Sequence, residues 1–134
     1  MRKSYLYIDN TNDKGRAVFT QQRIAAGTVI EVAPVIVMEG KDREHLDKTL
    51  LHDYIFEWGK EKDLPAGQAG KCCMALGYVP MYNHSYKSNC EYFMDFEAEV
   101  ILIKTVRKIE KGEELTINYN GDWDDGKTVW FEAV

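Results

Sequence analysis

Two polar stretches of this chain combine side chains that could carry out chemistry. Asn83-His84-Ser85 brings an amide, an imidazole and a hydroxyl together beside aromatic residues. Gly112 to Tyr119 (Gly-Glu-Glu-Leu-Thr-Ile-Asn-Tyr) is a glycine turn that leads into a short β-type segment ending on a tyrosine. Polar side chains among apolar neighbours must satisfy their hydrogen bonds internally or serve a ligand. The two stretches are therefore either structural clusters or parts of one binding site.

Several common enzyme classes lack their sequence signatures in this chain. There is no Gly-x-x-x-x-Gly-Lys or Gly-x-Gly-x-x-Gly phosphate loop, and no Gly-x-Ser-x-Gly nucleophile elbow. The cysteines Cys72, Cys73 and Cys90 form no Cys-x-x-Cys pair and are odd in number. We interpret them as small buried apolar residues. The sequence predicts neither a metal site nor a disulfide framework.

Composition places limits on the class of protein. With 134 residues, of which 45% are hydrophobic, the chain is long enough for one domain with a substantial core. A net charge of −5 argues against a nucleic-acid partner, because such proteins normally present a basic face. The N-terminal residues lack the apolar segment of a signal peptide, and no apolar run approaches the length of a membrane span. A soluble protein without a membrane partner, cytoplasmic by default, is the resulting expectation.

The hydrophobic pattern predicts short strands separated by turns rich in Gly and Asn. The expected strands cover residues 5–8, 16–20, 28–32, 35–38, 91–95 and 100–105. Pro34 is expected to separate the third strand from the fourth, and the last two strands to form a hairpin. Residues 42–51 are the best helix, with Leu46 and Leu50 on one stripe.

A short internal echo adds one more prediction. Residues 24–27 (Ile-Ala-Ala-Gly) and residues 109–112 (Ile-Glu-Lys-Gly) both place Gly three residues after Ile, each ahead of an expected strand. Two similar turns serving two similar hairpins are therefore expected. Many short strands with one good helix predict a mainly β fold made of small sheets.

Four stretches, in this order, resemble the SET-domain protein lysine methyltransferases. They are Lys14-Gly-Arg-Ala-Val-Phe19, Asn83-His84-Ser85 through Asn89-Cys90, Gly112 to Tyr119, and the closing Trp130-Phe131-Glu132. The resemblance covers nearly the whole chain. It implies a SET-type β-clip of several small sheets with one or two short helices, in which the second and third stretches cross in a pseudoknot. It also implies a single SET domain over residues 1–134, with residues 120–134 closing the pocket.

The function implied by the resemblance is transfer of a methyl group from S-adenosylmethionine to a lysine amine in a protein or peptide. S-adenosylhomocysteine would be the product. Tyr119 would be the catalytic tyrosine, and Tyr54, Tyr82 and Tyr119 would line the substrate channel. The residues implied in cofactor binding are Gly15, Arg16, Ala17, Asn83, His84, Tyr119 and Trp130.

Each of these roles has a structural alternative. Tyr119 could be an ordinary tyrosine at a strand end, and Asn83-His84-Ser85 could cap backbone groups in a turn. The aromatic side chains of Tyr54, Tyr82 and Trp130 could fill the core. Gly15 could be required only by a turn.

The acidic side chains could attract a basic peptide or simply solvate a surface. They are Glu91, Asp95, Glu97, Glu99, Asp122, Asp124 and Asp125.

The chain departs from the family pattern at three points. Ala17 stands where a second glycine is usual, Ser88 replaces a common proline, and the zinc-binding cysteine cluster that often follows the domain is absent. A binding module that retains a cofactor or peptide groove without turnover is therefore an alternative, as is a purely structural β-clip. Both a monomer and a homodimer are compatible with the sequence.

Overall fold

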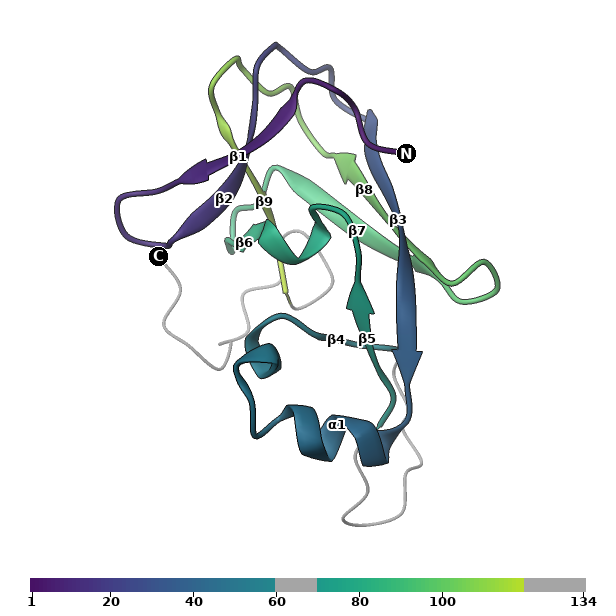
Figure 1. Cartoon of the computed structure of the whole chain (residues 1–134). Helices are drawn as coiled ribbons and strands as arrows, with labels where there is room; N and C mark the ends of the chain where they lie inside the picture. Colours follow the sequence, from purple (N-terminus) through teal and green to yellow (C-terminus); the bar gives the residue numbers. More distant parts are fainter. Residues whose placement is uncertain (60–69, 120–134) are drawn as a thin grey trace.

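The computed structural model describes residues 1–59 and 70–119, and most of their regular structure lies in two β-sheets (Figure 1). The strands are β1 (Leu6–Asn10), β2 (Arg16–Thr20), β3 (Val29–Met38), β4 (Phe56–Glu57), β5 (Cys72–Ala75), β6 (Asn83–His84), β7 (Cys90–Asp95), β8 (Val100–Thr105) and β9 (Glu114–Ile117). The helical elements are α1 (Gly40–Leu46) and the 3₁₀ turns η1 (Leu50–Asp53) and η2 (Val79–Met81). The predicted fold class, mainly β with small sheets and short helices, is confirmed.

The smaller sheet has the strand order β1-β2-β9-β6. β1 and β2 form an antiparallel hairpin whose turn is fixed by Thr11, because its hydroxyl donates to the Gly15 carbonyl at 2.8 Å and accepts from the Lys14 N–H at 2.7 Å. Gly15 has φ of 72°, a conformation that glycine adopts without steric cost. β6 runs parallel to β9, whereas the other pairs of this sheet are antiparallel.

The larger sheet has the order β4-β5-β3-β8-β7 and supplies much of the core. The hairpin that the sequence predicted is formed by β7 and β8, and its register pairs Cys90 with Thr105 and Asp95 with Val100. Along β8, Ile101 and Ile103 are fully buried, while Val100, Leu102 and Lys104 are only half-buried. This alternation is typical of a strand with one face on the core.

Pro34 does not interrupt its strand, so the prediction of two separate strands was wrong. β3 is continuous because it changes partners at the proline: it pairs with β8 up to Pro34 and with β5 from Val35 onward. The Pro34 carbonyl still accepts from the Leu76 N–H at 3.0 Å. The missing donor of proline therefore falls where one ladder ends and the next begins.

The predicted helix over residues 42–51 is also corrected. α1 begins at Gly40 and ends at Leu46, and the chain then turns before η1. Leu50 is 75% exposed, so it does not share a buried stripe with Leu46. Thr49 ends the first segment and caps the second, because its hydroxyl donates to the Leu46 carbonyl and accepts from the Leu51 N–H.

The two echoed turns pair with each other, so the prediction of two separate hairpins was wrong. Ile24 and Ile109 exchange both backbone hydrogen bonds at 2.9 Å. Gly27 and Gly112 both have positive φ, as similar turns would require. One turn leads from β2 in the smaller sheet to β3 in the larger sheet, and the other leads from β8 back to β9. The paired turns thus join the two sheets.

The interpretation of the cysteines as buried apolar residues is confirmed. Cys72, Cys73 and Cys90 are free thiols with no exposed surface. Burial raises the pKa of both Cys73 and Cys90 to about 12, so these thiols are protonated at neutral pH. Within residues 1–59 and 70–119, no helix is long and apolar enough to cross a membrane.

Candidate functional site

The two polar stretches singled out in the sequence meet in the smaller sheet. Asn83 pairs with Thr116 and His84 with Ile117 in the parallel β6–β9 ladder. The Ser85 N–H continues this ladder by donating to the Ile117 carbonyl at 3.0 Å. The predicted meeting of the two stretches is therefore observed. The pseudoknot itself stays a prediction.

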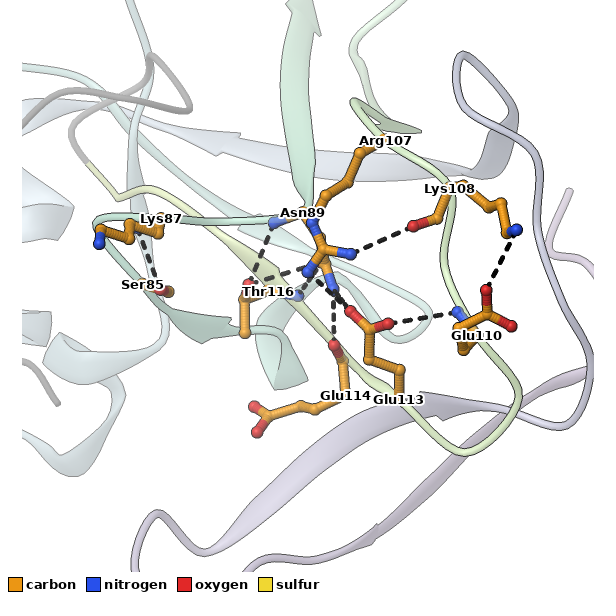
Figure 2. A network of polar contacts seen from close by, with 9 residues as sticks. All are labelled: Ser85, Lys87, Asn89, Arg107, Lys108, Glu110, Glu113, Glu114 and Thr116. Atoms are coloured by element: carbon orange, nitrogen blue, oxygen red, sulfur yellow. Dashed lines mark hydrogen bonds and ion pairs between the residues drawn. The ribbon is translucent and has the colours of Figure 1, made fainter.

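The side chain of Asn89 forms hydrogen bonds with the backbone of β9 (Figure 2). Its Oδ1 accepts from the Thr116 N–H at 2.8 Å, and its Nδ2 donates to the Glu114 carbonyl at 2.8 Å. The same Nδ2 donates to the Glu113 carboxylate at 3.0 Å. Because Asn89 is 2% exposed, these bonds are protected from water. One amide side chain thus gives β9 the contacts that a neighbouring strand would otherwise provide.

A surface ion pair continues this network outward (Figure 2). Arg107 donates to the Glu113 carboxylate at 2.7 Å, and the Glu110 N–H donates to the same carboxylate at 3.2 Å. Arg107 and Glu113 side chains are 54% and 29% exposed. The network therefore runs from a buried amide to a half-exposed pair, and it fixes the chain at the start of β9.

His84 positions the backbone at the end of β9. Its Nδ1 accepts from the Tyr119 N–H at 2.9 Å, and the two rings lie 5.1 Å apart. Burial, together with the nearby Lys14, lowers the pKa of His84 below its ordinary value. The imidazole is therefore neutral at pH 7, as an acceptor at Nδ1 requires.

The hydroxyl of Tyr119 is also fixed. It donates to the Tyr82 carbonyl at 2.8 Å. Burial raises the pKa of Tyr119 to about 12, and Tyr54, Asp53 and Glu114 act in the same direction. A phenol with this pKa is protonated near neutral pH, so Tyr119 can orient a partner by hydrogen bonding but is not a ready base.

Aromatic side chains surround Tyr119. The Phe56 ring meets it edge-on with centroids 6.5 Å apart and also lies 5.6 Å from the Tyr92 ring. The Tyr92 hydroxyl donates to the Tyr119 carbonyl at 3.4 Å. Tyr54, at the end of η1, lies near enough to affect the pKa of Tyr119. Sequence analysis named Tyr54 but missed Phe56 and Tyr92.

The predicted cofactor residues of β2 lie next to Asn83. The Asn83 Nδ2 is 3.4 Å from the Arg16 carbonyl and 3.2 Å from the Glu114 carboxylate, donating to both. Gly15 and Arg16 are exposed, whereas Ala17 is fully buried. The methyl group that distinguishes Ala17 from glycine is therefore buried.

Of the two remaining predicted residues, the structure describes Tyr82 but not Trp130. Tyr82 is 1% exposed, and its hydroxyl donates to the Glu31 carboxylate at 3.0 Å, so its carbonyl is the group that reaches Tyr119. The role of the Tyr82 ring as a channel wall stays a prediction. Trp130, together with residues 120–134 that were predicted to close the pocket, lies outside the described residues.

Sequence reasoning missed the role of Asn89, although it quoted the residue as part of a motif. A signal was present: a polar Asn directly before Cys90, at the entry to an apolar strand, indicates a side chain that must find partners inside the fold.

In the part of the chain that the structure describes, no group of three or more His, Cys, Asp and Glu side chains could hold a metal ion.

Comparisons with known proteins agree with this arrangement. The SET domain family profile matches residues 15–120. The histone-lysine N-methyltransferase of Schizosaccharomyces pombe that is specific for lysine 37 of histone H3 is 34% identical over 131 residues, which cover 97% of this chain and 79% of that protein.

Two solved structures share the fold. A candidate histone methyltransferase of Plasmodium falciparum superposes with a TM-score of 0.64 at 23% identity, covering 88% of this chain and 99% of that one. A structure from work on the product specificity of histone lysine methyltransferases gives 0.71 at 20% identity, covering 96% of this chain and 57% of that one. The extent of the family match and the identity to the yeast enzyme show that this chain belongs to the SET-domain family of protein-lysine methyltransferases.

Proposed function

We propose that this protein transfers a methyl group from S-adenosylmethionine to the side-chain amine of a lysine in a protein substrate. The observation that carries the proposal is the fixed Tyr119 hydroxyl at the junction of β6 and β9, bonded to the Tyr82 carbonyl and surrounded by aromatic side chains. Membership of the SET-domain family supports the same activity.

The residues next to Asn83 fit a cofactor that carries positive charge. S-adenosylmethionine supplies a methyl group activated by a positively charged sulfonium, and its amino-acid part carries an ammonium group. The Arg16 and Tyr82 carbonyls and the Glu114 carboxylate provide oxygen acceptors suited to such cations. His84 adds no opposing charge because its ring is neutral.

The backbone at Gly15 suits the close approach of a ligand. Gly15 is exposed, and a Cβ built there would meet no atom within 4 Å, so the space beside this backbone is open. We therefore expect the backbone of Gly15 and Arg16, Asn83, the backbone of His84 and Tyr119 to hold the cofactor, whereas Ala17 is fully buried and would only support this backbone. The proposed contribution of Trp130 lies outside the described residues.

Tyr119 would act by orienting the lysine amine. A phenol oxygen that donates its proton to a carbonyl can also accept a hydrogen bond. With its donor direction fixed by Tyr82, the oxygen can accept from the incoming amine and hold its lone pair in line for displacement. The pKa of about 12 keeps this hydroxyl protonated throughout.

The lysine must arrive as, or become, a neutral amine. Apolar and aromatic walls disfavour a buried ammonium and lower its pKa, so Phe56, Tyr54 and Tyr92 would promote loss of the proton. Before the proton is lost, the same rings can contact the lysine ammonium group through their faces. Asp53 and Glu114 would first attract the charged form toward the site.

A lysine-containing protein or peptide is the proposed substrate, and a basic one would suit the net charge of −5. The related yeast protein acts, by its name, on lysine 37 of histone H3, so histones are the first substrates to try. A cytoplasmic location, a single domain over residues 1–134, and a monomeric or homodimeric state stay predictions.

A thermal-shift measurement with S-adenosylmethionine and S-adenosylhomocysteine tests cofactor binding. At a ligand concentration of about 100 times the dissociation constant, a specific ligand stabilises the native state by about 2.7 kcal/mol. We expect this stabilisation in the wild type and its loss in Asn83→Ala. Arg23→Gln, which changes an exposed residue whose ion pair is with Glu110, is the control and should retain it.

Stabilisation of Asn83→Ala equal to that of the wild type would contradict the placement of the cofactor. Absence of any shift in the wild type, with both ligands, would contradict cofactor binding by this chain. Binding without methyl transfer to any lysine-bearing protein would favour the alternative, a binding module without turnover.

A further inference from the structure

A buried carboxylate lies behind the Tyr82–Tyr119 pair. Glu31, on β3, is 1% exposed although it carries a titratable group. The register of β3 against β8 shifts between Val29 and Glu31, and both Ile30 and Glu31 are buried as a result. A bulge of this kind turns a side chain toward the interior.

The carboxylate of Glu31 contacts both ends of the η2 turn. Its Oε2 accepts from the Tyr78 N–H at 2.7 Å, directly before η2. Its Oε1 accepts from the Tyr82 hydroxyl at 3.0 Å, directly after η2. One carboxylate therefore fixes residues 78–82 at two points, and the carbonyl of the last residue is the one that holds Tyr119.

The surroundings of Glu31 are adapted to this contact. Gly77 has φ of 66°, and a Cβ there would collide with Oε2 of Glu31. Arg2 pairs with Glu31 through a backbone bridge and places its guanidinium 3.7 Å from the centre of the Tyr78 ring. Burial raises the pKa of Glu31, while the Tyr78 and Tyr82 hydrogen bonds and the Arg2 charge oppose this. Burying a carboxylate is costly unless hydrogen bonds and opposite charge compensate it, and Tyr78, Tyr82 and Arg2 provide that compensation here.

We propose that Glu31 is a positioning residue that fixes the Tyr82 carbonyl and, through it, the direction of the Tyr119 hydroxyl. This inference rests on the proposed function for its effect on turnover. Its effect on the environment of Tyr119 does not depend on that function. Glu31 touches neither lysine nor cofactor in this scheme, and it acts only through residues 78–82.

Glu31→Gln tests the contact with little change of shape. A glutamine oxygen can accept from only one of the two donors, and its NH₂ group would face the other. We expect kcat to fall by roughly tenfold, with KM for peptide and cofactor within about twofold of the wild type. Tyr82→Phe, which removes one donor, should cause a smaller fall, and the double variant should show less than the sum of the two effects.

The NMR chemical shift of the Tyr119 ring provides a readout that does not require activity. In protein with ¹³C-labelled tyrosine rings, the Tyr119 signal should shift in both Glu31→Gln and Tyr82→Phe. A purely structural role of Glu31 would lower the melting temperature without moving this signal. If the wild type methylates nothing but the signal moves, the proposed function fails while the positioning role of Glu31 stands.

Two glycine variants distinguish the effect of displacing the Glu31 carboxylate from the effect of backbone strain alone. Gly77→Ala and Gly27→Ala both place alanine at positive φ, but only the first collides with Glu31. We expect Gly77→Ala alone to shift the Tyr119 signal, although both lose stability. An unchanged Tyr119 signal in Glu31→Gln and in Gly77→Ala would overturn the proposal. If Glu31→Gln does not fold, an unchanged signal in Tyr82→Phe and Gly77→Ala would do so.

Discussion

The two sheets of this protein are held together by different means. The larger sheet pairs β7 with β8 over six residue pairs and buries apolar side chains such as Ile101 and Ile103. The smaller sheet contains the β6–β9 ladder of only two pairs, and it relies on the Asn89, His84 and Asn83 side chains. The β1–β2 hairpin of the smaller sheet pairs over five residues, so it is the β6–β9 part, where the site forms, that is supported by polar side chains in place of a long ladder.

A core truncation in the larger sheet should have the largest effect on stability. Ile101→Ala removes a fully buried side chain, and such changes lower the free energy of unfolding by about 2–5 kcal/mol. Urea denaturation measures this loss. The dissociation constant of S-adenosylhomocysteine for the folded variant should stay within about twofold, because Ile101 lies on β8 in the larger sheet and not on the strands that carry the site. A large change in that constant would show that the two sheets are not independent.

Removal of the Asn89 amide should have a smaller effect on stability but a larger one on the site. Asn89→Ala leaves the Thr116 N–H and the Glu114 carbonyl without this partner, which should cost about 2–3 kcal/mol. It should also weaken S-adenosylhomocysteine binding, measured by calorimetry, since β9 leads to Tyr119. Asn89→Asp is the matched control. It keeps the acceptor for Thr116 but loses the two donors and places a second carboxylate beside Glu113. Unchanged binding by both variants would contradict a role of Asn89 in the site.

The pH dependence of stability should report His84. Its pKa in the folded protein lies below its ordinary value of 6.5, so the unfolded chain binds this proton more readily. The stability due to the neutral ring is therefore complete above that value and is lost as the pH falls below it. We expect the melting-temperature difference between wild type and His84→Asn to narrow from about pH 7.5 to about pH 5.5. Glu31, whose pKa is raised by burial, titrates with the opposite sign but is common to both proteins. A constant difference would contradict a neutral His84.

Two surface ion pairs should give the smallest effects and differ from each other. Arg23 and Glu110 side chains are 68% and 54% exposed, so Arg23→Gln should cost less than about 0.5 kcal/mol. Arg107→Gln should cost about 1 kcal/mol, because Glu113 also accepts from the buried Asn89. Chemical denaturation in low salt measures both values. Equal losses of stability in the two variants would show that the Arg107–Glu113 ion pair adds no stability to the hydrogen bonds of Asn89.

Local patterns in the sequence predicted most of the strands, whereas the meeting of the two polar stretches was implied by the family resemblance. The β7–β8 hairpin follows from two apolar runs around a charged turn, and the resemblance implied that the segments of Asn83-His84-Ser85 and Gly112 to Tyr119 would meet. The end of α1 was not predictable from periodicity, because Thr49 ends the helix through side-chain hydrogen bonds.

Features that depend on partners distant in sequence were missed. Pro34 is tolerated inside β3 only because the neighbouring strand changes there. The inward turn of Glu31 follows from a bulge against β8, and the hydroxyl of the buried Tyr82 donates to its carboxylate. A tyrosine in an aromatic stretch can serve either as core or as channel wall, and only the three-dimensional neighbours distinguish the two.

Methyl transfer by the wild type and by Tyr119→Phe tests the proposed activity most directly. Both proteins would be incubated with radiolabelled S-adenosylmethionine and a mixture of core histones and other lysine-rich proteins, and label on lysine would be identified by mass spectrometry. We expect transfer by the wild type and a fall of about 100-fold or more in Tyr119→Phe, because the group that orients the amine is lost. Transfer by Tyr119→Phe at the wild-type rate, or no transfer by the wild type to any lysine, would contradict the proposed function.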